Sequence, residues 1–460
     1  AQKAFQQAEK LYHNAPKGTF FINDASRLYQ QWGEFAYQSM KINILEETGT
    51  KLQYLGENEN LPRLIGISKM ALANACLLRR NIDTGLKIIQ EALRIIDFEV
   101  DPLIYIRAVL REGSLFWLKL ELDQAAQAAD TAINLIKKTD GDSSELTSLE
   151  FYARYVLTMC LYAKGEGITA LSYLQETQEK FTDQLNAFDQ MRMYYLYSYV
   201  HLLLANYKDC IDYSLQGYKM ADSMGHDYTA EICLIHLSNA NFYQGYLDEA
   251  YAFASEALRL GEKNNHKHII AFANCAIGDI FGLLNNYVLA AKHFRVAQLR
   301  LGFSDNSLTH LDTNLHLSNL FIWHDNFKEA RVLFSPVLKT TEKAGIKHLL
   351  AQALILSGTC DIIEGNLDLA ERKFNQVTNI VRNNGLKFEI LWCKLQQARL
   401  AISKGNYSFA GEIITAILAD QRFSVAGFNL YALGMCAQIQ KLSNQIVVPN
   451  LQNKFSTYLS

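Results

Sequence analysis

The sequence predicts an all-α protein, a right-handed α-solenoid of about nine helical hairpins with additional helices at both ends. Its 460 residues are too many for one ordinary core, which favours several domains or a repeat array. Only 5 prolines and 25 glycines are present, which disfavours a loop-rich β protein. One phrase also recurs at a fixed interval. It reads "GYLDEAYAFASEALRL" (245–260), "HDNFKEARVLF" (324–334) and "EGNLDLAERKF" (364–374).

Small residues set the register of the repeat. One small residue, the anchor, recurs every 40 residues, with a single step of 45 across the polar stretch "KKTDGDSSELTS" (137–148), where we expect a longer loop. The residue twelve positions before each anchor is also small in every copy, and the residue three positions before it is apolar except at Gly167. The anchors are Gly85, Ala125, Ala170, Cys210, Ala250, Ala290, Ala330, Ala370 and Ala410.

Each repeat reads as two helices joined by a short turn. Residues 230–244 and 247–265 both have helical apolar spacing and good helix formers. Small residues between them let the helix axes approach closely. The second helices should end in a left-handed residue at Gly225, Asn265, Gly345 and Gly385. One hairpin cannot bury its apolar faces alone, whereas a stack can.

These columns, with motifs such as G-Y-L-D-E-A, resemble a tetratricopeptide (TPR) array over roughly residues 64–424. The 40-residue period departs from the usual 34, and the closing proline is missing, so the helices should be longer. HEAT and armadillo repeats have similar periods but do not predict the paired small columns. The chain is similar to the sensor region of bacterial maltose-regulator-like signalling ATPases, and to intracellular peptide-pheromone receptors.

We therefore expect three parts. Residues 1–60 form N-terminal helices, for example around 25–41, with a degenerate repeat as one interpretation. Residues 64–424 form a nine-repeat TPR-like superhelix. Residues 425–460 form a capping helix and a polar tail.

The composition and motifs favour binding over catalysis. A net charge of -3 gives no reason to expect nucleic-acid or membrane binding, and eight scattered cysteines without a C-x-x-C pair suit a reduced, cytoplasmic protein. No phosphate-binding loop, dinucleotide fingerprint, H-E-x-x-H or G-x-S-x-G occurs. We expect no catalytic residue, no metal and no cofactor, and we interpret "HKH" (266–268) as a solvated turn.

A polar column lies eleven residues before the anchors, next to the small column on the first helix of each hairpin. The resemblance implies that this helix lines a concave surface, where an asparagine holds a peptide backbone. Residues three before and four after the column share its helical face, which gives two matching His–Asn–aromatic triples. The predicted peptide-binding residues are Asn74, His236, Asn239, Tyr243, Asp279, His316, Asn319 and Trp323.

Two interpretations of these residues remain open. At least two of Asn239, Asp279 and Asn319 contact a ligand, or the column only satisfies hydrogen bonds between helices. The predicted function is a non-catalytic scaffold or sensor domain that binds a protein segment or peptide, within a larger signalling protein whose other domains are further candidate partners. The alternatives are a self-contained peptide-pheromone receptor, and an enzyme acting on a phospho-protein through surface glutamines such as Gln6 and Gln31.

Overall fold

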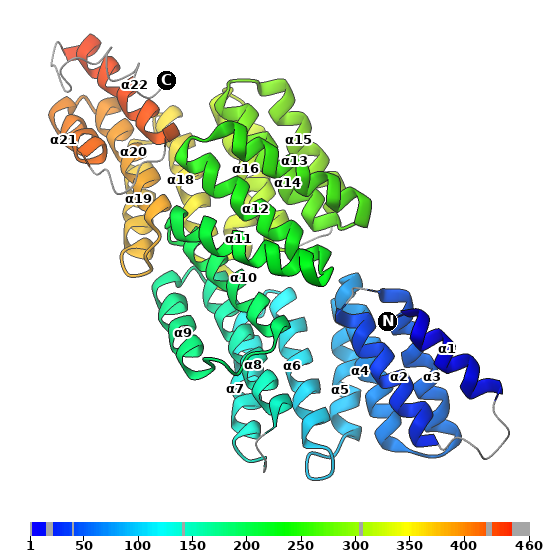
Figure 1. The fold of residues 1–460 in the computed structure, drawn as a ribbon. Helices are drawn as coiled ribbons and strands as arrows, with labels where there is room; N and C mark the ends of the chain where they lie inside the picture. The colour runs from blue at the N-terminus through cyan, green and yellow to red at the C-terminus, as the bar shows by residue number, and fades with distance from the viewer. Residues whose placement is uncertain are drawn as a thin grey trace. The chain divides into compact units, whose positions relative to one another are not determined.

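The computed structural model describes residues 2–14, 22–38, 41–139, 143–302, 307–419 and 426–443. Every regular element within these ranges is a helix, which confirms the all-α fold class (Figure 1). The helices are α1 (Gln2–Asn14), α2 (Ile22–Gln38), α3 (Ile42–Asn58), α4 (Pro62–Arg79), α5 (Ile82–Ile95), α6 (Pro102–Leu118), α7 (Leu122–Ile136), α8 (Ser144–Ala163), α9 (Gly167–Lys180), α10 (Ala187–Leu203), α11 (Tyr207–Met224), α12 (Asp227–Gln244), α13 (Leu247–Asn264), α14 (Lys267–Leu283), α15 (Tyr287–Leu301), α16 (Leu308–Trp323), α17 (Phe327–Ala344), α18 (Lys347–Ile363), α19 (Leu367–Val381), α20 (Lys387–Ser403), α21 (Tyr407–Ala419) and α22 (Ala426–Ser443).

The chain folds as two compact units. The N-terminal unit comprises residues 1–160 and 177–189, and the C-terminal unit comprises residues 161–176 and 190–460, so the boundary passes through α8 and α9. Consecutive helices pair into hairpins in both units, for example α4 with α5 and α12 with α13. The division into residues 1–60, 64–424 and 425–460 remains a prediction.

Local sequence explains where the helices of a hairpin begin and end. Helix α12 ends at Gly245, whose φ of 90° is easily adopted only by a residue without a side chain. Helix α13 then begins with Asp248 and Glu249 in its first turn, where the helix dipole favours negative charge. It ends at Asn265, which has a φ of 57°. Gly225 and Gly345 end α11 and α17 with positive φ, so these predicted helix ends are confirmed. Gly385 has a positive φ as well, but α19 already ends at Val381, so the fourth prediction was wrong.

The two small columns meet inside each hairpin. The hydroxyl of Ser238, twelve residues before its anchor, donates a hydrogen bond of 2.8 Å to the carbonyl oxygen of Ala250, which is fully buried. Gly358 occupies the same column as Ser238 in another repeat. There a Cβ would lie 2.6 Å from Cε1 of Phe374. Small residues are therefore required because the facing helix fills the space that a larger side chain would need.

We predict that Gly358→Ala lowers the free energy of unfolding by about 1–3 kcal/mol, because the added methyl group would overlap the buried ring of Phe374. Urea denaturation would measure the change. Gly434→Ala in α22 is the matched control, since no heavy atom lies within 4 Å of its added Cβ. In the double variant with Phe374→Leu the two costs should not add, and strict additivity would contradict the overlap.

The C-terminal unit has an inner layer made of the first helices of its hairpins. In the C-terminal unit α12, α14, α16, α18 and α20 pack successively against one another, while the second helices pack chiefly against the first helices (Figure 1). Twelve residues of α12 are buried but only four of α13, although the two helices have equal length. A helix buried on several sides belongs inside, so the first helices form the inner layer.

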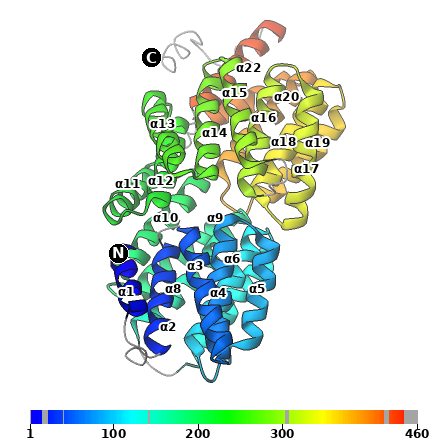
Figure 2. The ribbon, with the colours of Figure 1, turned by 90° about the vertical axis from the view of Figure 1, so that its right-hand side faces the viewer.

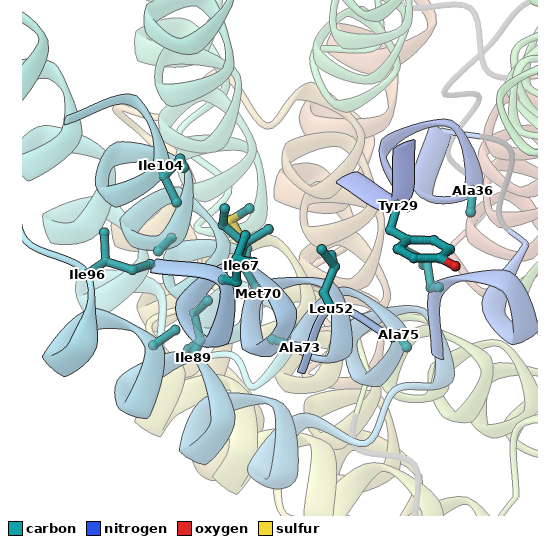
Figure 3. Close-up of a cluster of buried hydrophobic side chains, with 14 of the residues drawn as sticks. Tyr29, Ala36, Leu52, Ile67, Met70, Ala73, Ala75, Ile89, Ile96 and Ile104 are labelled. Atoms are coloured by element: carbon teal, nitrogen blue, oxygen red, sulfur yellow. The ribbon is translucent and has the colours of Figure 1, made fainter. Parts of the chain in front are cut away.

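The N-terminal unit has its own core, formed by α2, α3, α4, α5 and α6. Figure 2 shows α3, α4, α5 and α6 of this unit side by side. Tyr29 and Ala36 from α2, Leu52 from α3 and Ile67 from α4 contribute buried side chains to one cluster (Figure 3). The predicted helix around residues 25–41 corresponds to α2 and packs against α3.

The C-terminal unit contacts itself across a long stretch of sequence. The backbone N–H of Lys347 donates to the carbonyl of Lys164 at 3.0 Å, and its ammonium lies 2.6 Å from Oε1 of Glu166. One repeat later, the Lys387 ammonium donates to Oδ1 of Asn206 at 2.9 Å. Both side-chain pairs are separated by 181 residues. We call this contact the seam. It joins the ends of α8 and α10 to the starts of α18 and α20.

The predicted helix at residues 425–441 corresponds to α22, which packs against α20 and α21. Its last buried residues, from Ala432 to Ile439, complete a core cluster that includes Leu395 and Ile414. The apolar face of the last hairpin is therefore covered by α22. The predicted polar tail, residues 442–460, lies outside the described residues except for its first two positions.

Candidate functional site

The structure divides the predicted binding residues between the two units. Asn74 lies on α4 of the N-terminal unit. The other seven lie in the C-terminal unit, on the inner-layer helices α12, α14 and α16. The inner layer of the C-terminal unit is therefore the candidate site.

The polar column splits into two kinds of residue. Asn239 and Asn319 are half-buried, and neither makes a hydrogen bond to another described residue. Asp279, between them, is bonded to His316, with Nδ1 of the imidazole 2.9 Å from Oδ1 of the carboxylate. The two asparagines are thus available to a ligand, whereas Asp279 already has a partner in α16, the next helix of the inner layer.

His316 is flanked by two carboxylates. Besides Asp279, Oδ2 of Asp312 lies 3.5 Å from Nε2 of the ring. Burial lowers the pKa of His316, but the charges and hydrogen bonds of Asp279 and Asp312 outweigh burial and hold that pKa well above its ordinary value. The imidazole is therefore a cation at neutral pH, and the three groups together carry a net negative charge.

His236 has the opposite character although it occupies the same repeat position. Its side chain is 3% exposed, and Nδ1 lies 2.7 Å from the hydroxyl of Ser198. The residue 37 positions before His236 is Tyr199, and its ring centroid lies 4.2 Å from that of the imidazole. The residue 37 positions before His316 is the carboxylate Asp279. Burial without a carboxylate lowers the pKa of His236 to about 3. The two His–Asn–aromatic triples therefore match in sequence but differ in charge.

The two aromatic residues of the triples also differ. Tyr243 is half-buried and lies between Tyr207 and Phe388, with centroid distances of 5.2 Å and 5.1 Å. Trp323, at the end of α16, is 59% exposed and has no aromatic partner among the described residues. Only Tyr243 is packed within the inner layer.

Glu389, on α20, is an inner-layer residue that the sequence reasoning missed. It is 3% exposed. Its Oε1 accepts a hydrogen bond of 2.8 Å from Nε2 of Gln352, but Oε2 has no partner among the described residues. Burial, together with the charge of Asp312, raises the pKa of Glu389 to about 7.

The charge of Glu389 acts on three phenols of the same unit. Burial raises the pKa of Tyr162, Tyr207 and Tyr243, and in each case the charge of Glu389 raises it further. Tyr162 and Tyr243 are nevertheless only half-buried. Tyrosines from α8, α11 and α12 are therefore electrostatically coupled to one carboxyl group from α20. We call Tyr162, Tyr207, Tyr243, Asp312 and Glu389 the tyrosine–carboxylate cluster.

The sequence held a signal for Glu389. It lies 21 residues before its anchor, and this column is otherwise uncharged except at Asp189. The remaining residues of the column are Leu64, Ile104, Leu149, Thr229, Ile269, Thr309 and Leu349. A carboxylate in a column of mostly apolar residues indicates a buried charge.

The interpretation of "HKH" as a solvated turn was wrong. Nδ1 of His266 lies 2.5 Å from Oε2 of the buried Glu231, and His268 is itself buried. Both side chains turn inward because polar groups of neighbouring helices are there to receive them. Within the described ranges no three His, Cys, Asp or Glu side chains are arranged to hold a metal ion.

No helix in the described part of the chain has the length and apolar character needed to span a membrane. No protein-family model and no curated protein matches the sequence. Solved structures do match. A Rap protein complexed with Competence and Sporulation Factor is 13% identical, with a TM-score of 0.54 over 82% of this chain and 99% of that one.

Two further structures are similar. NprR in complex with its cognate peptide NprX is 15% identical, with a TM-score of 0.51 over 75% of this chain and 98% of that chain. A signal transduction ATPase with a tetratricopeptide repeat sensor from Pyrococcus horikoshii is 13% identical, with a TM-score of 0.46 over 81% of this chain and 56% of that chain. The likeness to Rap and NprR shows the fold, so the chain is a TPR-like helical array.

Proposed function

We propose that the chain is a non-catalytic receptor that binds a short peptide or extended protein segment on the inner layer of its C-terminal unit. The observation that carries this proposal is Oε2 of Glu389, a buried carboxyl oxygen without a partner among the described residues. An unpaired buried polar atom costs about 1–3 kcal/mol, so a structure that retains one has a use for it. A ligand that donates a hydrogen bond would supply the missing partner.

The surrounding groups indicate what the ligand carries. Asn239 and Asn319 each offer an amide, which matches the donor and acceptor of a peptide unit. Glu389 and Asp312 add negative charge among three phenol rings, an environment suited to an ammonium or guanidinium group. The proposed ligand is therefore an extended peptide whose backbone contacts the asparagines and whose basic group contacts the tyrosine–carboxylate cluster.

Two findings outside the site support this function. The structures of Rap and NprR with TM-scores above 0.5 were solved as complexes with a sporulation factor and a cognate peptide. All eight cysteines are free, in keeping with a reducing, cytoplasmic setting. In this proposal residues 64–424 are the receptor, either as the sensor domain of a longer signalling protein or as a self-contained pheromone receptor.

The proposal can be tested with a random-sequence peptide library displayed on phage. Selection against the full chain should recover peptides enriched in lysine or arginine, and synthetic versions should bind saturably. Glu389→Gln should weaken their binding, because the amide cannot carry the negative charge that attracts the basic group. Recovery of no saturable binder, or only of acidic peptides that bind Glu389→Gln equally well, would contradict the proposal.

We predict that Asn239→Ala and Asn319→Ala each weaken binding of a recovered peptide about tenfold, because one peptide group loses its hydrogen-bond partner. The melting temperature without peptide should change little, since neither side chain is bonded to another described residue. Asn383→Ala, at an exposed position after α19, is the control and should leave affinity unchanged. Unchanged affinity together with a heavy loss of stability would assign both asparagines a structural role.

A further inference from the structure

The N-terminal unit holds a buried arginine that has no carboxylate partner among the described residues. Arg111, on α6, is 9% exposed. Its Nη1 donates to the hydroxyl of Tyr37, and its guanidinium carbon lies 4.1 Å from the centroid of that ring and 6.0 Å from that of Tyr152. Nε has no partner among the described residues. A guanidinium group cannot lose its proton in a protein, so the positive charge stays buried, with only the hydroxyls and rings of Tyr37 and Tyr152 beside it and no carboxylate among the described residues to balance it.

The neighbouring arginine shows that this unit can supply carboxylates. Arg107, one turn earlier on the same face of α6, lies 2.5 Å from Glu34 on α2 and 2.7 Å from Glu145 on α8. Among the described residues, the same two flanking helices contact Arg111 through Tyr37 and Tyr152. Of these two arginines, therefore, Arg111 alone lacks a carboxylate partner among the described residues.

The repeat register points to where an anion would bind. Arg111 and Asn74 occupy the columns of His316 and Asp279, and both pairs are 37 residues apart. In the C-terminal unit that position provides a carboxylate 2.9 Å from the imidazole. In the N-terminal unit it provides the amide of Asn74, whose Oδ1 is also buried without a partner. Arg111 and Asn74 thus lie on two helices that pack against each other, and each has a buried polar atom without a partner among the described residues.

We propose that Arg111 and Asn74 bind a carboxylate group of a ligand, either a peptide C-terminus or an acidic side chain. The guanidinium Nε–H and the amide N–H of Asn74, after rotation of the amide, would each donate to one carboxylate oxygen. A single positive charge balances a monovalent anion. A phosphate monoester, which carries more charge, would be repelled by Glu34 and Glu145 one turn away. This site is independent of the proposed function of the C-terminal unit.

The test is amide hydrogen exchange across α4 and α6 in the full chain. Sodium acetate is the probe, and sodium chloride at equal ionic strength is the reference. At ten times its Kd, acetate should slow exchange in these helices about tenfold, because it binds only the folded unit. Arg111→Met should abolish this response. Arg94→Met removes the same charge from an exposed position on α5 and should respond like the wild-type chain.

A second variant supplies the anion from within. Asn74→Asp places a carboxylate in the column of Asp279, so it should slow exchange in α4 and α6 without acetate and abolish the response to added acetate. If Arg111→Met does not fold, the result for Asn74→Asp alone tests the proposal. Three results would overturn the proposal: no difference between acetate and chloride, an unchanged acetate response in either variant, or protection by phosphate but not by acetate.

Discussion

Replacing Glu389 by glutamine is expected to raise the free energy of unfolding by about 3 kcal/mol at pH 8 and to change it little at pH 4.5. The pKa of Glu389 is about 7 in the folded chain and 4.5 as its ordinary value. Because the folded pKa is raised, Glu389 contributes stability below pH 4.5 that is lost as pH rises through about 7. This difference between the folded and the ordinary pKa corresponds to about 3 kcal/mol of stability. Glutamine does not ionise, so the variant does not lose that stability as pH rises.

Urea denaturation at several pH values would measure this effect. Glu262→Gln, at an exposed position on α13, is the control and should leave the pH dependence unchanged. Parallel stability curves for the wild-type chain and Glu389→Gln would contradict the buried charge. If the stabilised variant also loses its basic peptide, the cluster is a site where stability is given up for binding.

Between pH 8 and pH 4 the free energy of unfolding of the wild-type chain is expected to fall by about 3 kcal/mol more than that of the variant His236→Gln. Burial depresses the pKa of His236 to about 3 in the folded chain, against an ordinary value of 6.5. Its contribution is therefore present above pH 6.5 and is lost as pH falls towards 3, because the unfolded chain binds the proton first.

The slope of stability against pH is the quantity to measure, since loss of the bond to Ser198 shifts the whole curve. His324→Gln, at an exposed position after α16, should retain the wild-type slope. A slope for His236→Gln equal to that of the wild-type chain would show that the imidazole does not stay neutral when buried.

The hairpins could be predicted from sequence because their constraints are local. The small residue at Ala250, the matching Ser238 and the turn at Gly245 lie within one repeat, and each leaves a visible column. The resemblance to TPR arrays, which rests on the same columns, implied that Asn239 and Asn319 lie on inner helices. The sequence could not predict that their side-chain amides are free of hydrogen bonds to other described residues, because this depends on which side chains the adjacent helices place beside them.

The charge of the site depends on residues in other repeats. His236 and His316 look alike until the residue 37 positions earlier is compared, Tyr199 in one case and Asp279 in the other. The environment of Glu389 depends on tyrosines that are far away in sequence and are brought near by the pitch of the solenoid. No single repeat encodes that pitch, so the tyrosine–carboxylate cluster was not predicted.

The seam changes how the C-terminal unit can come apart. In a simple repeat array each hairpin contacts only its neighbours, so the ends fray and opening spreads one repeat at a time. Here Lys347 and Lys387 connect hairpins to others 181 residues earlier. Loss of a middle hairpin would also break these distant bonds. The hairpins between the two sides of the seam should therefore open together, as one cooperative block that forms late in folding because its contacts are so remote in sequence.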